Sequence, residues 1–363
     1  MRYKKFFALL LALALVCGSL SGCAAGQTAA PAEPAVSFTD SLGRTVDIPE
    51  TLTRVAPSGA VASMFLATIA PEYMTTINAT PSSSQYKYLD PRLIDLPTTG
   101  QMYGSKSTLN LESILTSGVQ VVIDLGDKKD NMAADLDALQ RQIGMPVIFI
   151  EADLPHMAEA YRTLGKILSG KEARGEELAA FVEETVSMAE ENAANIQDSE
   201  RISVLYTSGS SGLNTNAKGS IQAQVLDLMG IENAAVVEDV SNKGGGNPIN
   251  LEQLYRFDPD VILFAAGSIY QTAAGDEAWQ PLRAIQTGRY YEVPSMPYNW
   301  LSGPPSLNML LGVWWLGNLL YPQYYDYDMV EKTQEMFRLF WAYDLSADEA
   351  RAMLANSTLK DAS

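Results

Sequence analysis

Short runs rich in β-branched residues alternate along the chain with longer segments in which apolar residues recur at helical spacing. The short runs predict strands in both halves of the chain, at 54–56, 74–78, 119–124 and 146–150 and again at 202–206, 261–264 and 290–293. Apolar runs of this length between amphipathic helices are typical of parallel strands that are buried on both faces. The pattern therefore predicts an α/β fold with mostly parallel central sheets.

A long stretch between the two groups of strands carries no strand signal. Met157, Tyr161, Leu164 and Leu168 keep helical spacing, and a second helical pattern begins after Gly170. We therefore expect two α/β lobes joined by one long α-helix. The expected parts are an N-terminal lobe over 36–154, connecting helices over 155–197 and a C-terminal lobe over 198–363 that ends in helices over 329–345 and 347–354.

The first residues combine a basic start, an apolar run over 6–16 and a cysteine at position 23. The apolar run is too short to span a membrane, and the layout is that of a secretory signal. Leu20-Ser21-Gly22-Cys23 resembles the lipobox that directs cleavage before the cysteine and lipid attachment to it; the alternative is a plain signal peptide cut elsewhere. We predict a signal peptide over 1–22 and a lipidated Cys23, which would anchor the protein to the outer face of the cytoplasmic membrane.

A flexible tether is predicted over 23–35, because its Ala, Gly, Pro, Gln and Thr residues cannot bury enough apolar surface to fold. The whole chain has 25 Lys and Arg against 43 Asp and Glu, a formal net charge of −18. Such an acidic protein is not expected to bind nucleic acid.

The single histidine, His156, restricts the chemistry that the chain can perform. One histidine cannot form a multi-histidine metal site, and no Gly-x-Ser-x-Gly motif marks a hydrolase nucleophile. We expect a surface histidine at the start of the connecting helix and no enzymatic activity. A lipid-anchored hydrolase, for which no nucleophile and base can be assembled, and a structural or adhesive lipoprotein are the alternatives from other classes.

A short motif occurs once in each predicted lobe. Asn110-Leu111-Glu112 precedes the strand at 119–124, and Asn250-Leu251-Glu252 precedes the strand at 261–264 with the same offset. In both copies the asparagine can cap a helix whose first turn carries the glutamate. A helix start explains either copy alone, but it explains less well why both lobes place the same acid at the same position.

Together these motifs resemble the class III substrate-binding proteins of ABC importers, the iron-siderophore, vitamin B12 and haem type. Residues 38–49 are similar to the opening hairpin of that family, and residues 218–230 resemble the first helix of its second lobe. The resemblance covers nearly the whole chain after the tether. It implies a receptor that captures a small-molecule metal chelate and delivers it to a permease dimer with its ATPase subunits. It further implies that Glu112 and Glu252 dock onto that permease.

Loops at the carboxyl ends of the strands are expected to hold the ligand. Hydroxyls, amides and aromatic rings on these loops could contact a bulky chelate, although ordinary packing is the alternative for each ring. The candidate ligand-binding residues are Ser58, Gly59, Tyr86, Tyr103, Thr207, Asn242, Lys243, Ser268, Tyr298 and Trp300. A bare metal ion would require clustered histidines or carboxylates. We therefore expect no metal site or cofactor of the protein's own, and a ferric siderophore as cargo, with a corrinoid or haem as the alternative.

Overall fold

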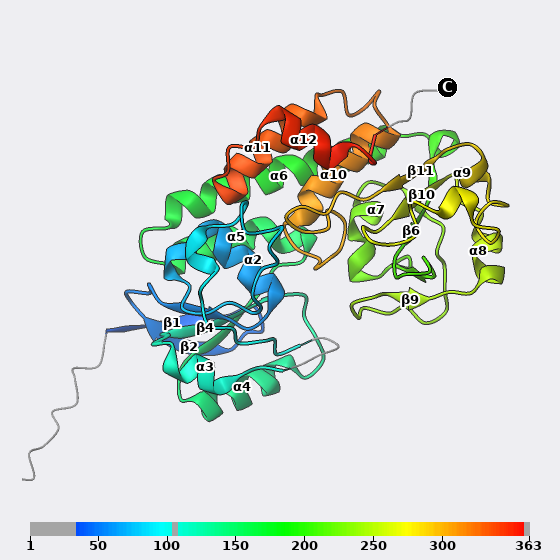
Figure 1. The fold of residues 1–363 in the computed structure, drawn as a ribbon. Helices are drawn as coiled ribbons and strands as arrows, with labels where there is room; N and C mark the ends of the chain where they lie inside the picture. The colour runs from blue at the N-terminus through cyan, green and yellow to red at the C-terminus, as the bar shows by residue number, and fades with distance from the viewer. Residues whose placement is uncertain (1–33, 104–107, 359–363) are drawn as a thin grey trace, which may run out of the picture. The chain divides into compact units, whose positions relative to one another are not determined.

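The computed structural model of the protein describes residues 34–103 and 108–358. The predicted signal peptide, the predicted lipidation site Cys23 and most of the predicted tether lie outside the described residues. The described residues from Ala35 onward belong to one compact unit, drawn in colour in Figure 1. Among the described helices, none has both the length and the apolar character that a membrane span requires.

An antiparallel hairpin opens the compact unit, as the family resemblance implies. It consists of β1 (Ala35–Thr39) and β2 (Thr45–Pro49), with Phe38 opposite Val46. The Asp40 carboxylate fixes the turn, because its Oδ1 accepts hydrogen bonds of 3.0 Å from the backbone N–H groups of Leu42 and Arg44.

Three parallel strands form the sheet of the N-terminal half, in the order β3-β4-β5. Every residue of β4 is buried, and alternate residues enter different apolar clusters, Ile123 with residues of α2 and Val122 with residues of α4. The sheet is thus covered on both faces, as the apolar runs predict. The elements are β3 (Val55–Pro57), β4 (Val121–Gly126), β5 (Val147–Glu151), α2 (Ala60–Ile69), α3 (Leu111–Thr116), α4 (Met132–Ile143) and the 3-10 turns η1 (Pro71–Tyr73) and η2 (Pro91–Leu93).

The strand predicted at 74–78 is wrong. The segment forms only isolated bridges, Val55 with Met74 and Ile77 with Thr98. Thr75 N–H donates to β3, whereas Ile77 N–H donates to Pro97 on another segment. Because the chain changes partners after two residues, no continuous ladder forms, although Met74 and Ile77 are both buried.

A second parallel sheet forms the C-terminal half, in the order β11-β10-β6-β8. Its strand β10 coincides with the predicted strand at 261–264, and Ile262 and Leu263 again pack into separate clusters. The elements are β6 (Ser203–Thr207), β8 (Glu232–Asn233), β10 (Val261–Phe264), β11 (Tyr290–Glu292), the small antiparallel pair β7 (Asn214–Thr215) and β9 (Asn247–Pro248), α7 (Gln224–Leu228), α8 (Leu251–Phe257), α9 (Arg283–Gln286), η5 (Ile221–Ala223) and η6 (Ala273–Gly275).

Helices connect the two sheets, as predicted: η3 (Leu154–His156), α5 (Met157–Ile167), the 24-residue α6 (Glu172–Asn195) and η4 (Asp198–Glu200). Helices α5 and α6 approach closely where two glycines meet, because a Cβ on Gly175 would lie 2.8 Å from Gly165 Cα. Gly170 turns the chain between the helices with φ +71°. The predicted fold class, parallel sheets joined by one long helix, is confirmed.

Three C-terminal helices complete the fold (Figure 1): α10 (Asn308–Leu320) packs beside α6, α11 (Met329–Trp341) beside α10 and α2, and α12 (Ala347–Leu354) beside α11. Helix α10 is buried along nearly its whole length and ends just before Pro322, so it is a core helix. Its Trp314 Nε1–H donates to Thr185 Oγ1 of α6 over 2.9 Å, and both side chains are buried. The apolar core that contains Trp314 includes residues of both sheets.

Candidate functional site

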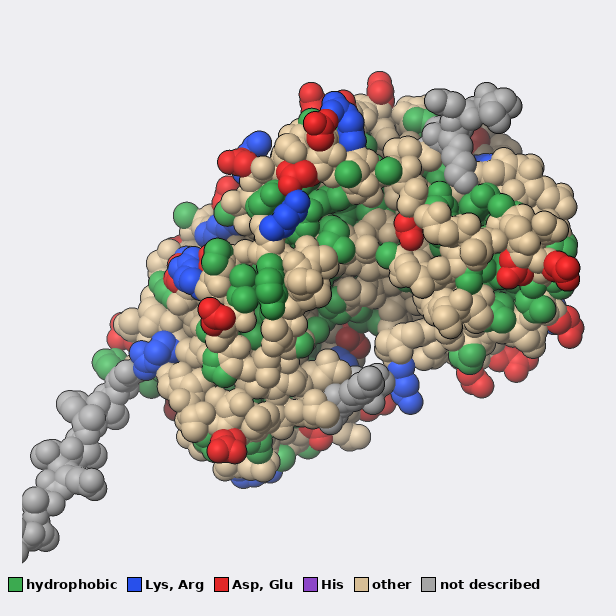
Figure 2. All heavy atoms as spheres, in the orientation of Figure 1, with side chains coloured by type: hydrophobic (Ala, Val, Ile, Leu, Met, Phe, Trp, Pro, Cys, Tyr) green, Lys and Arg blue, Asp and Glu red, His purple; other side chains and the backbone are tan. Residues whose placement is uncertain are grey.

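A cavity of about 590 Å³ lies at the carboxyl ends of strands from both sheets. Ser58 and Gly59 follow β3, residues 124–127 end β4, and Tyr206 and Ser208 lie at the end of β6. The space-filling view shows the surface hollowed between the elements of the two halves (Figure 2). Its volume is in the range of small-molecule sites, and parallel α/β proteins bind their ligands at this edge of the sheet.

Asp124 lies within the buried strand β4, and its side chain lines the cavity. The Ser58 hydroxyl donates a hydrogen bond to Asp124 Oδ1. Burial raises the pKa of this carboxyl to about 6, which the bond from Ser58 and the charge of Lys129 only partly oppose. At neutral pH the carboxyl is therefore mostly ionised.

The charged residues after β4 form a pair of their own. Lys129 Nζ donates to Asp127 Oδ1 over 2.9 Å and to the Asp127 carbonyl over 3.0 Å. The same ammonium lies 5.2 Å from the ring centre of Tyr103, and burial raises the pKa of the Tyr103 phenol. This wall of the cavity therefore offers one neutralised ion pair and one phenol.

Residues of the C-terminal half contribute carboxamides and hydroxyls. Asn216 Nδ2 donates to Ser302 Oγ over 2.8 Å, and Asn299 Oδ1 accepts from the backbone N–H groups of Leu301 and Ser302. Gln222 Oε1 is buried and has no hydrogen-bond partner among the described residues. These side chains can both donate hydrogen bonds to a ligand and accept them.

Part of the predicted ligand-binding set lies together in this cavity. Ser58, Gly59, Tyr103 and Asn242 line it, although Asn242 Oδ1 already accepts from the Ile221 N–H.

The other predicted residues do not line the cavity. Tyr86 is exposed and Tyr298 packs against the core, while Trp300 is fully buried and its Nε1 donates to the Met296 carbonyl over 2.8 Å. Thr207 is fully buried, Ser268 Oγ donates to the Gly209 carbonyl, and the Lys243 carbonyl accepts from Gln222. The part of each in ligand binding stays a prediction.

The sequence reasoning missed Asp124 and the ion pair behind it. The signal that could have found Asp124 is an acid at the end of an apolar run, but such a run by itself predicts only a buried strand. Further cavity residues outside the predicted ligand-binding set are Gln101, Asp127, Lys129, Tyr206, Asn216, Gln222 and Ser302.

Glu112 and Glu252 occupy matching positions in the two halves. Each lies in the first turn of a short helix, α3 or α8, and each side chain is exposed. Glu252 Oε1 accepts from Arg256 on the next turn over 3.2 Å, an exposed contact that a partner could displace. Both glutamates are therefore accessible to another protein.

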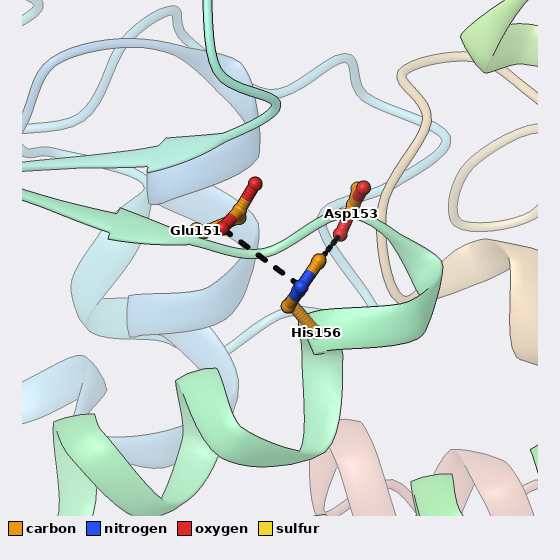
Figure 3. Close-up of side chains that lie close together, drawn as sticks. All are labelled: Glu151, Asp153 and His156. Carbon is orange, nitrogen blue, oxygen red and sulfur yellow. Dashed lines mark hydrogen bonds and ion pairs between the residues drawn. The ribbon is translucent and has the colours of Figure 1, made fainter. Parts of the chain in front are cut away.

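Outside the cavity, Glu151, Asp153 and His156 bring possible metal-ligand atoms within 4.8 Å of one another (Figure 3). Each group already has a protein partner. His156 Nδ1 is bonded to the Asp153 carboxylate, and Lys128 Nζ lies 2.6 Å from Glu151 Oε2. Because each of the three side chains already has a protein partner, the cluster requires no metal ion. His156 is partly exposed at the start of α5, as the sequence predicts.

Comparisons with known proteins agree with this fold. A model of the periplasmic binding protein family matches residues 56–297. No curated protein sequence matches the chain.

Solved structures of two-lobed binding proteins match over most of the chain. An ABC transporter solute-binding protein of Sulfurospirillum deleyianum is 26% identical, with a TM-score of 0.80 over 88% of this chain and 99% of that one. The molybdate-bound periplasmic binding protein MolA of Haemophilus influenzae is 18% identical, with a TM-score of 0.69 over 86% and 99%. Helicobacter pylori CeuE in a complex with Ni-His is 14% identical, with a TM-score of 0.62 over 90% and 100%. The last two show the fold alone.

Proposed function

Because the chain belongs to the periplasmic binding protein family, whose members bind a substrate outside the cytoplasm for an ABC importer, we propose that it captures a ferric siderophore. The siderophore would be delivered to a permease dimer with its ATPase subunits. Members of the family bind their substrates rather than convert them, and we propose that this chain likewise has no enzymatic activity.

The cavity at the strand ends carries this proposal. Its volume of about 590 Å³ suits a ligand of several hundred daltons, and its walls present hydroxyls, carboxamides and a phenol. Such groups hydrogen-bond the oxygen atoms and amide groups on the outside of an iron chelate, whose metal is already fully coordinated. The protein then needs no metal ligand of its own.

The cavity bears differently on other cargoes. Haem iron takes an axial ligand from His, Cys, Met or Tyr, and the lining residues Tyr103 and Tyr206 could supply one, so haem stays an alternative cargo. A tetrahedral oxyanion, such as the molybdate bound by MolA, would fill a small part of the volume and would approach the ionised Asp124. A corrinoid is the other alternative cargo of the same family.

Glu112 and Glu252 are proposed as the docking residues for the permease. Their exposure and their matched positions at the starts of α3 and α8 support this role. Two equivalent acids on the two halves of one body suit a partner whose two subunits are related by two-fold symmetry.

The N-terminal segment is proposed to tether the protein. Cleavage before Cys23 and lipid attachment to its thiol would hold the receptor on the outer face of the cytoplasmic membrane. The flexible residues that follow would keep it at a high effective concentration near the permease. Mass spectrometry of the exported protein tests this, because a Cys23→Ser variant should lack the lipid.

Ligand titrations test the proposed cargo. The protein lacking residues 1–35 would be titrated by isothermal calorimetry with ferric hydroxamates, ferric catecholates, cobalamin, haem and molybdate. Binding of a ferric chelate alone supports the proposal. Binding of cobalamin alone favours the corrinoid alternative, and binding of molybdate or haem alone contradicts the proposal.

A further inference from the structure

Asp124 is a buried acid whose hydrogen bonding is incomplete. Its side chain is only 5% exposed, and Oδ1 accepts from the Ser58 hydroxyl. Oδ2 is buried without a hydrogen-bond partner among the described residues. A buried charged oxygen without a partner costs considerable free energy, so a group that pairs with it on binding gains correspondingly.

Among the described residues, no neighbouring side chain neutralises this carboxylate. Of the described residues that line the cavity, Lys129 alone carries a positive charge, and its ammonium is already paired with Asp127. The remaining lining side chains are neutral apart from the two acids. The described lining residues therefore carry one excess negative charge, located on Asp124.

The start of helix α2 places partial positive charge at the cavity, opposite in sign to the Asp124 carboxylate. Gly59, Ala60 and Val61, at the start of α2, also line it. A helix start carries roughly half a positive charge, distributed over several backbone N–H groups. This partial charge is smaller than the full negative charge of the Asp124 carboxylate, so the net charge of the described lining stays negative.

We propose that Asp124 selects chelates that present a positively charged group, an ammonium above all, and that it disfavours anionic chelates. The inference rests on the proposed function, because it takes the ligand to be a ferric chelate. A ligand ammonium would donate to Asp124 Oδ2, while the Ser58 hydroxyl holds Oδ1 and orients the carboxylate. Charge-assisted hydrogen bonds of this kind are the strong ones in buried sites.

A matched pair of ligands isolates the effect. Ferrioxamine B carries a free ammonium, and its N-acetylated form replaces that ammonium with a neutral amide while keeping the same ferric centre. The protein lacking residues 1–35 would be titrated by calorimetry with both, with anionic ferric enterobactin, and with ferrichrome as a further ferric hydroxamate. Two variants accompany the wild type: Asp124→Asn, and Asp130→Asn as a control that removes an exposed acid from the loop after β4.

We expect the wild type to bind ferrioxamine B about tenfold or more tightly than the acetylated form. Asp124→Asn should abolish this preference and Asp130→Asn should keep it. Equal binding of the two forms, or tighter binding of ferric enterobactin, overturns the inference and leaves the proposed function standing. A preference that survives in Asp124→Asn also overturns it. Failure of all three chelates, with ferrichrome failing too, contradicts both the inference and the siderophore proposal.

Discussion

Asn110 and Asn250 cap equivalent helices in the two halves of the protein by the same hydrogen bond. The side-chain oxygen of Asn110 accepts from the Ser113 N–H over 3.2 Å, and that of Asn250 accepts from the Gln253 N–H over 2.9 Å. In the second copy the Gln253 side chain also accepts from the Asn250 N–H, which completes a capping box. The repeated motif in the sequence is thus a repeated helix start in the structure.

Removal of the second cap should destabilise the protein. Asn250→Ala leaves the Gln253 N–H without its acceptor, and we expect a loss of about 1 kcal/mol in the free energy of unfolding. Urea denaturation followed by circular dichroism measures this loss. Asn250→Asp retains a side-chain acceptor and serves as the control. An alanine variant as stable as the aspartate variant would show that the cap contributes nothing.

Substitution of the paired glutamates should separate binding from transport. With Glu112 and Glu252 both changed to alanine, the affinity for a ferric chelate should be unchanged, since neither residue lines the cavity. Iron uptake by cells should fall several-fold, because the permease loses two charge contacts. Glu159→Ala removes an exposed acid from α5 and is the control. A loss of chelate affinity in the purified double variant would contradict the docking role.

The contact between α6 and α10 should contribute measurably to stability. Thr185→Val keeps the side-chain volume but leaves the buried Trp314 Nε1–H without an acceptor, at an expected cost of about 1–3 kcal/mol. The same substitution in a Trp314→Phe background should cost much less, because the donor is then absent. Urea titrations of the four proteins give the coupling energy. A coupling near zero would show that this hydrogen bond adds no stability.

The contribution of Asp124 to stability should fall as the pH rises through its titration. Burial raises the pKa of Asp124 from 3.8 to about 6, so the folded protein binds this proton more readily than the unfolded chain does. Below the pKa of Asp124 in the unfolded chain, the buried charge therefore costs no stability. Above its pKa in the folded protein, the charge costs on the order of 3 kcal/mol. Lys129, Asp127 and Tyr103 are the titratable neighbours.

Asp124→Asn tests this dependence, since it removes the charge. Its stability relative to the wild type should be about 1–3 kcal/mol greater near pH 7.5 than near pH 4.5. Asp130→Asn should show no such difference between the two conditions. Parallel curves for the Asp124 variant and the wild type across this range would contradict the assignment of the raised pKa.

The parallel strands were predictable because they are buried on both faces. Continuous apolar runs identify β4, β5, β6 and β10 to within one or two residues. The same reasoning fails at 74–78, where Met74 and Ile77 are buried in a segment that pairs with two different partners. An apolar pattern predicts that a segment is buried. It predicts a strand only where one neighbouring segment runs beside it for several residues.

The position of the site was predictable in part, and its composition less so. The rule that ligands lie at strand ends places Ser58, Gly59, Tyr103 and Asn242 in the cavity. It does not distinguish which residue of a loop faces inward. Asn299 lines the cavity, for example, while the adjacent Trp300 is buried in the core. That choice depends on tertiary packing, which a single sequence does not encode in a readable pattern.

The apolar core that contains Trp314 is shared between the two halves. It includes Ile123 of the first sheet, Phe181 of α6 and Leu263 of the second sheet. A fragment ending at residue 197 would expose the apolar face of α6 that α10 covers, and so it should not fold by itself. The protein should accordingly melt in one calorimetric transition, and a protease that opens one half should degrade the other as well.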